Sequence, residues 1–202
     1  MLFRLSAAVI ATALMIGCSP GSPPGDAAVT ASPPAADWQS IFDGSSLAGW
    51  SQVGDANWSV ADGVVMADSG NGFLVSDASY GDFDIALEFW VSPDANSGVF
   101  LRCADRNDVG AGTCYEVNIY DQRPDPTYRT GAIVNVAPPQ VNIDTGGKWN
   151  DYEISAHGGH FVVKLDGQVT VDTDNDLHAS GPIGLQYGTG TVKFRKIRIR
   201  TE

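Results

Sequence analysis

Polar and apolar residues alternate in two short runs of this chain, Asn96–Arg102 and Tyr115–Asp121. Alternation with period two predicts β-strands, because successive side chains of a strand point to opposite faces. In the second run Glu116, Asn118 and Tyr120 would therefore share one face. Carboxyl, amide and aromatic groups gathered on one sheet face are the groups that bind sugars, so the sequence predicts a carbohydrate site there.

A third alternating run, Phe83–Val91, places Glu88 and Trp90 on a common face. If the three runs pair as a meander, Glu88, Arg102 and Glu116 lie on one surface. We then expect both glutamates to act as acid, base or metal ligand, and Arg102 to bind an oxygen of the substrate. Two other interpretations stay open. One is a cross-strand charge ladder, and the other is two-carboxylate hydrolysis with the acids about two strand spacings apart.

Further polar and aromatic residues flank this expected face. Tyr120 and Trp90 could stack on a sugar ring, and Asn118 and Gln186 could bind its hydroxyls. Asp121 stands at a strand end, where it is either a hydroxyl ligand or a residue that starts a turn. Glu116 and Asp121 are also the candidate ligands for a divalent metal ion, the one cofactor that these residues suggest.

Composition favours an acidic all-β domain. The chain has 202 residues, a formal net charge of −12, 23 Gly and 11 Pro. The excess of acidic residues argues against nucleic acid as a partner, since phosphate binding needs clustered Lys and Arg. Short alternating runs separated by turn residues continue to the end of the chain, one of them at 132–136. They predict an antiparallel β-sandwich or jelly roll.

The first residues include an apolar stretch that ends at Gly17-Cys18 and resembles a bacterial lipoprotein signal. We expect a signal peptide at residues 1–17, lipidation of Cys18, and a flexible tether at 18–37 that is rich in Pro, Ala, Gly and Ser. The folded domain would span 38–202. The expected location is the outer membrane, with the domain in the periplasm or at the cell surface. An ordinary signal peptide with cleavage nearby is the alternative.

Cys103 and Cys114 flank a short loop rich in Asp and Gly. A secreted domain meets an oxidising environment, which favours a disulfide between them. Closing a loop of this length would stabilise the fold by about 3 kcal/mol. The alternative is a pair of metal ligands, although no nearby His or second Cys pair accompanies them.

Several motifs together resemble the 3-keto-disaccharide hydrolase domain family. The resemblance extends roughly over residues 38–201. Its main motifs are Phe42-Asp43-Gly44 with Gly49-Trp50, Tyr80-Gly81-Asp82-Phe83, Asn96-Ser97-Gly98-Val99-Phe100-Leu101-Arg102, Tyr115-Glu116-Val117-Asn118-Ile119-Tyr120-Asp121 and Gly184-Leu185-Gln186. The resemblance implies a β-sandwich of the concanavalin or laminin-G type. It also implies action on glycosides whose C3 hydroxyl has been oxidised to a ketone.

Such a ketone acidifies the proton on C2. Its removal gives an enolate that expels the glycosidic oxygen from C1, and water addition completes a net hydrolysis. The enzyme needs a base and a group that stabilises the enolate oxygen, and a companion oxidoreductase could supply the keto substrate. The sequence departs from many relatives at Leu185-Gln186-Tyr187-Gly188, where they carry a histidine. This departure favours the main alternative, a lectin-like module that binds glycans without chemistry. A structural envelope domain is a third possibility.

Overall fold

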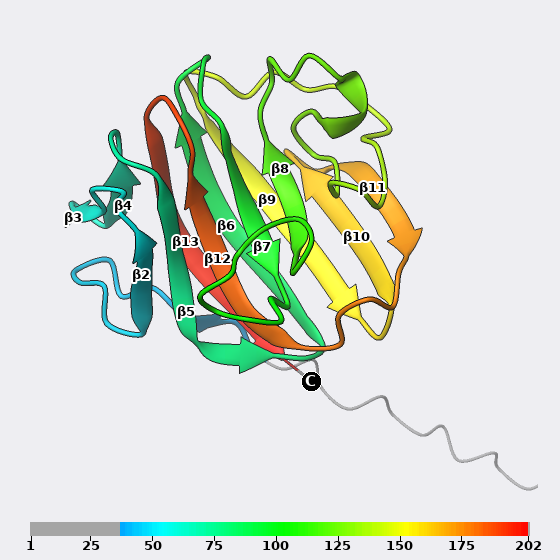
Figure 1. Cartoon of the computed structure of the whole chain (residues 1–202), viewed down its shortest axis with the longest axis horizontal. Helices are drawn as coiled ribbons and strands as arrows, with labels where there is room; N and C mark the ends of the chain where they lie inside the picture. Colours follow the sequence, from blue (N-terminus) through cyan, green and yellow to red (C-terminus); the bar gives the residue numbers. More distant parts are fainter. Residues whose placement is uncertain (1–36, 202) are drawn as a thin grey trace, which may run out of the picture. The chain divides into compact units, whose positions relative to one another are not determined.

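The computed structural model describes residues 37–201, which form two antiparallel β-sheets packed face to face (Figure 1). The larger sheet has eight strands in the order β11-β10-β9-β6-β13-β4-β3, with β1 paired to β13, and the smaller sheet has five in the order β2-β5-β12-β7-β8. The predicted all-β sandwich is therefore confirmed. The predicted signal peptide, Cys18 and all but the last residue of the tether lie outside the described residues.

Strands account for most of the described chain, and no helix within residues 37–201 is long and apolar enough to cross a membrane. The elements are β1 (Gln39–Ser40), β2 (Trp50–Gly54), β3 (Ser59–Ala61), β4 (Val64–Ala67), β5 (Gly72–Tyr80), β6 (Phe83–Val91), β7 (Ser97–Leu101), β8 (Tyr115–Ile119), the 3-10 turn η1 (Pro126–Tyr128), β9 (Trp149–His157), β10 (His160–Leu165), β11 (Gln168–Asp174), β12 (Gly181–Tyr187) and β13 (Val192–Thr201).

The core lies between the sheets and is filled by the apolar half of each alternating strand. Phe89, Phe161 and Phe194 point inward from the larger sheet, and Val117 and Leu185 point inward from the smaller one. Burying one face of each strand fixes its register, since a slip by one residue would turn its apolar side chains toward water. The polar half of β8 must therefore face outward.

The expected meander of three consecutive strands is wrong. β6 pairs with β9 and β13 in the larger sheet, whereas β7 and β8 pair with each other in the smaller sheet. The chain crosses from one sheet to the other at residues 92–96, which are enough to span the about 10 Å between packed sheets. Strands that are adjacent in sequence pair only about two-thirds of the time.

The run at 132–136 is also not a strand. Ile133 makes single bridges to Val117 and Ala137, and the residues between form a turn. This segment still lies along the outer edge of β8, where Val134 N donates to Glu116 O at 2.9 Å and Asn118 N donates to Ala132 O at 3.0 Å. The segment thus continues the smaller sheet beside Glu116.

The predicted disulfide between Cys103 and Cys114 is confirmed. The loop that it closes passes in front of the smaller sheet (Figure 1). There the two cysteines and Phe100 form a small buried cluster against which Phe73 and Val109 pack. The loop therefore covers the part of the outer face of the smaller sheet around Phe100.

Candidate functional site

Glu116, Asn118 and Gln186 project from the outer face of the smaller sheet, and we call them the polar cluster. On β7, Phe100 is the register partner of Glu116 and Gly98 is the partner of Asn118. The pairing of β12 with β7, continued by one row, places Gln186 on the other side of Gly98. The expectation that Glu116 and Asn118 share a face is therefore confirmed, and Gln186 lies on the same face.

Gly98 lies at the centre of the polar cluster, where its neighbours leave no room for a side chain. A Cβ atom there would lie 3.2 Å from Phe100 Cε2, 3.3 Å from Val117 O and 3.5 Å from Glu116 Cγ. Any larger residue would therefore press on the glutamate and on the phenylalanine ring. Two strand spacings, about 10 Å, separate the strands that carry Asn118 and Gln186. Gly98 lies on the strand between them and places no side chain there.

The carboxyl group of Glu116 has a pKa near neutral, which suits proton transfer. Burial raises the pKa of Glu116 to about 7, and the nearby positive charge of Arg123 offsets part of that rise. A base is most effective when its pKa lies close to the working pH. Strongly shifted pKa values are also typical of functional sites.

Two buried side-chain oxygens of the polar cluster have no hydrogen-bond donor. They are Asn118 Oδ1 and Gln186 Oε1. A buried acceptor without a donor costs about 1–3 kcal/mol, so such atoms are rare in folded proteins. Each of these oxygens can accept a hydrogen bond from an O–H group that reaches it.

Asn118 is held firmly from three sides. Its Nδ2 donates to Tyr128 O, its backbone O accepts from Gly131 N at 3.0 Å, and Tyr152 reaches through the core so that its hydroxyl donates to the same oxygen at 2.7 Å. The bond made by Nδ2 fixes the orientation of the amide. Oδ1 is therefore held on the side where it has no partner.

Arg123 is a site residue that the sequence analysis missed. Its guanidinium carbon lies 5.8 Å from the ring centroid of Tyr120 and 5.9 Å from that of Tyr128. Stacking between two rings holds the cation close to Glu116. One signal was present in the sequence, since Arg123 is among only 12 basic residues and follows the Glu116 strand directly.

Asp121 holds two neighbouring loop segments together through hydrogen bonds. Its Oδ1 accepts from the hydroxyls of Thr130 and Thr145, and its Oδ2 accepts from the backbone N–H groups of Thr145 and Gly146. Both carboxylate oxygens are thus used. Within residues 37–201 no group of three or more His, Cys, Asp or Glu residues is arranged to hold a metal ion. The predicted metal ligands Glu116 and Asp121 do not fit a metal centre.

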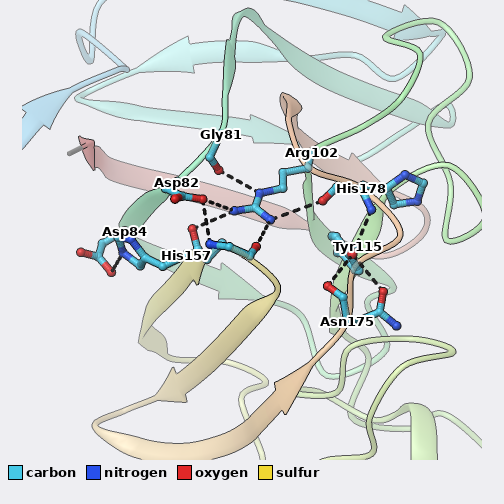
Figure 2. A network of polar contacts seen from close by, with 10 residues as sticks. Gly81, Asp82, Asp84, Arg102, Tyr115, His157, Asn175 and His178 are labelled. Carbon is cyan, nitrogen blue, oxygen red and sulfur yellow. Dashed lines mark hydrogen bonds and ion pairs between the residues drawn. The ribbon is translucent and has the colours of Figure 1, made fainter.

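Arg102 is buried in the fold, with 1% of its surface exposed (Figure 2). All five of its N–H groups donate within the protein, one of them to the carboxylate of Asp82 at 3.0 Å. The four carbonyl acceptors belong to Gly81, Ala156, Gly158 and His178. Since no donor remains for a substrate oxygen, the predicted binding role of Arg102 is replaced by a structural one.

Glu88 and Trp90 lie on the outer face of the larger sheet and do not meet the polar cluster. Hydrogen bonds from Lys196 and Arg195 outweigh the effect of burial on Glu88 and lower its pKa. The ring of Trp90 lies 4.6 Å from Lys193 Nζ. The expected placement of Glu88 beside Glu116 is therefore wrong, because β6 belongs to the other sheet.

Two solved structures share this fold. A Parabacteroides distasonis protein, provisionally named a glycosyl hydrolase, is 25% identical with a TM-score of 0.71, and the match covers 82% of this chain and 100% of that one. The carbohydrate-binding module CBM66 from Bacillus subtilis is 21% identical with a TM-score of 0.62, over 76% of this chain and 96% of the module. The second likeness shows the fold alone.

Two curated relatives are also similar in sequence. The levanase of Bacillus subtilis is 24% identical over 157 residues, which are 76% of this chain and 23% of the levanase. The 3-keto-disaccharide hydrolase of Bacteroides thetaiotaomicron is 26% identical over 155 residues, which are 60% of this chain and 53% of that protein. The chain thus spans about half or less of the length of these relatives. Residues 37–200 match the family described as the 3-keto-alpha-glucoside-1,2-lyase-like domain, and this chain belongs to that carbohydrate-active family.

Proposed function

We propose that this domain cleaves 3-keto-glycosides by removing the proton on C2 and expelling the oxygen on C1. The observation that carries the proposal is the raised pKa of Glu116, about 7, beside two buried oxygens that lack donors. Membership of the 3-keto-alpha-glucoside-1,2-lyase-like family supports 3-keto-glycosides as the substrate class. A carboxyl group of this pKa is ionised often enough near neutral pH to accept a proton and strong enough as an acid to return one.

Glu116 acts as the base. It takes the C2 hydrogen as a proton, and the electron pair of that bond forms the enolate between C2 and the C3 oxygen. The enolate then restores the C3 ketone, forms a double bond between C1 and C2, and breaks the bond from C1 to the leaving oxygen. That oxygen receives the proton from Glu116, and addition of water across the double bond gives the free keto sugar.

The other residues bind and stabilise. Asn118 Oδ1 and Gln186 Oε1 accept hydrogen bonds from sugar hydroxyls, which supply the donors that these oxygens lack. Arg123 brings positive charge toward the negative charge that develops on the enolate. Because its guanidinium rests on Tyr120 and Tyr128, it needs little rearrangement during the reaction.

A glycan-binding module without chemistry is the second candidate. The similarity in fold to CBM66 favours it, and so does the absence of a second acidic residue from the polar cluster. Donor-free amide oxygens suit both functions, whereas a carboxyl group with a pKa raised to about 7 suits proton transfer. We therefore favour the enzyme.

Release of free sugar separates the two candidates. The purified protein is incubated with 3-keto-trehalose, 3-keto-sucrose and 3-keto-lactose, and with the parent disaccharides as controls. Release from at least one keto substrate and from none of the parents is expected. Binding of these sugars without any release at high enzyme concentration would sink the enzyme and leave the glycan-binding module.

Gly98→Val is expected to reduce turnover by at least tenfold, because the new side chain would push Glu116 and Phe100 from their positions. Gly184→Val is the matched control. Its Cβ would lie 3.3 Å from Phe100 Cβ and 3.4 Å from Val109 Cγ1, away from Glu116. Values of kcat/KM for both variants, with melting temperatures to confirm folding, test this. Equal losses in the two variants would contradict a specific effect of the Gly98 position on Glu116.

We further propose that the protein is anchored in the outer membrane through lipidated Cys18 and works beside an oxidoreductase that oxidises C3 of the glycoside. The lipoprotein-like signal at the start of the chain motivates the first part, and the substrate chemistry motivates the second. Cys18→Ala should move the protein from the membrane fraction to the soluble fraction of its host. An unchanged distribution would contradict the lipid anchor.

A further inference from the structure

We infer that the outer face of the larger sheet carries a second binding site, which takes a linear, neutral oligosaccharide along β6. The polar cluster lies on the other sheet, so this site does not depend on the proposed cleavage. Two hollows mark it, one of about 300 Å³ and one of about 160 Å³. Glu153 lines both hollows, which therefore adjoin, and we call the two together the outer groove.

A small side chain forms the floor of the outer groove. Ala86 faces outward from the middle of β6, because its neighbours Ile85 and Leu87 belong to the core. It is the register partner of Arg198 on β13 and of Glu153 on β9, and all three line the smaller hollow. Since both partners have long side chains, Ala86 lies at the bottom of a trough that runs between β13 and β9.

The two walls of the outer groove carry opposite hydrogen-bonding groups. Lys196 and Arg198 from β13 can only donate, whereas the carboxylates of Asp151 and Glu153 from β9 can only accept. A sugar hydroxyl does both, so a sugar that lies along β6 can bond to the two walls at once. An anionic ligand would be repelled by the carboxylates and a cationic one by the basic side chains. The groove therefore suits a neutral ligand rich in hydroxyl groups.

A bulge in β13 adds a basic side chain to this face. The register with β6 shifts between Arg195 and Arg198, and Lys196 has a positive φ of 52°. Two consecutive residues, Arg195 and Lys196, thereby reach the same carboxylate, that of Glu88 on the outer face. A positive φ is unfavourable for a residue other than glycine, and bulges often redirect side chains beside binding sites. The strand thus departs from regular geometry where the donors of the outer groove are placed.

Tryptophan rings lie toward both ends of the outer groove. Trp38 lines the larger hollow and is 37% exposed. Trp90 and Trp149 are register partners toward the opposite end of β6. Three of the five tryptophans are thus on this face, each beside a Lys or Arg side chain, and aromatic rings offer a flat apolar surface to a sugar ring. From Asp84, beside Trp38 in the larger hollow, to Trp90 the strand extends about 20 Å, which suits several sugar units in a row.

Calorimetric titration with neutral hexasaccharides tests the inference. The probes are cellohexaose, maltohexaose, xylohexaose and mannohexaose, with the corresponding disaccharides for length and hexagalacturonate as the anionic counterpart. We expect at least one neutral hexasaccharide to bind, and to bind at least tenfold more tightly than its disaccharide, because several units contact the groove. Failure of all four to bind, or tighter binding of hexagalacturonate, would overturn the inference.

Two variants locate the binding. Ala86→Arg should weaken it at least tenfold, because a long side chain would fill the floor of the groove. Trp38→Ala should also weaken it, and it carries the test if melting temperatures show that Ala86→Arg is unstable. Gly98→Val is the matched control, since it obstructs the polar cluster on the other sheet, and it should bind the hexasaccharide as wild type does. Loss of binding in Gly98→Val, or unchanged binding in both groove variants, would contradict a site on the larger sheet.

Discussion

Glu116→Gln is expected to reduce the turnover of 3-keto-glycosides by roughly 100- to 10,000-fold, the usual contribution of a positioned acid or base. Glutamine keeps the size of the side chain and its ability to hydrogen-bond, but it cannot accept the C2 proton. Sugar binding should persist, since the oxygens of Asn118 and Gln186 are unchanged. Values of kcat/KM and dissociation constants for the same substrates measure both effects.

The same substitution should stabilise the fold, and the gain should grow as the pH rises. Burial raises the pKa of Glu116 from 4.5 to about 7 in the folded protein. Between these values the unfolded chain has released the proton while the folded protein retains it, so the free energy of unfolding of the wild type falls as the pH increases. Above pH 7 the loss is complete, on the order of 3 kcal/mol, and glutamine avoids it.

Melting temperatures of wild type and variant across pH 4 to 9 check this expectation. The two curves should lie close together near pH 4.5 and separate by several degrees near pH 8. Glu88→Gln is the matched control, because it removes a glutamate of the larger sheet whose pKa is lowered, not raised. A difference between Glu116→Gln and wild type that is independent of pH would contradict the raised pKa.

Arg102→Met should unfold the protein or leave it only marginally stable. The guanidinium donates to four backbone carbonyls and to Asp82, and it packs 5.3 Å from the ring centroid of Phe161. Its removal leaves these partly buried acceptors without their donors, at a cost of about 3 to 5 kcal/mol. That is a large fraction of the about 5–15 kcal/mol that stabilises a typical domain. Urea unfolding monitored by tryptophan fluorescence measures the loss.

Arg102→Lys distinguishes a structural role from a substrate-binding one. Lysine retains the charge but offers three donors in place of five, and it cannot reach the carbonyls on both sides of the site shown in Figure 2. A structural arginine predicts a lysine variant that is destabilised and whose folded fraction still turns over substrate. A variant with wild-type stability and strongly reduced kcat would contradict this account.

Local patterns predicted the strands and their faces but not the sheet to which each strand belongs. Alternation in β8 correctly placed Glu116 and Asn118 on the outer face, because burial of Val117 and its neighbours leaves no other choice. The assignment of β6 to the larger sheet depends on pairing with β9 and β13, which lie more than 50 residues further along the chain. No local signal in Glu88 or Trp90 reveals those partners.

The predicted ligand-binding roles of Arg102 and Asp121 were wrong for a related reason. The carbonyls that hold Arg102 come partly from residues 54 to 76 positions away. The donors that hold Asp121 include the backbone N–H group of Thr145, 24 positions later. A charged residue at a strand end looks the same in sequence whether it faces a ligand or anchors a loop. The raised pKa of Glu116 has the same origin, since burial is a property of the folded chain.

Exchange of the C2 hydrogen with solvent tests the central claim that Glu116 removes this proton. The protein is incubated with 3-keto-trehalose in deuterated water near neutral pD, and deuterium at C2 is followed by NMR against a protein-free blank. The account predicts deuterium at C2 of the released keto sugar with wild type, and none above the blank with Glu116→Gln. Release of sugar without deuterium at C2, or equal incorporation in the variant, would contradict it.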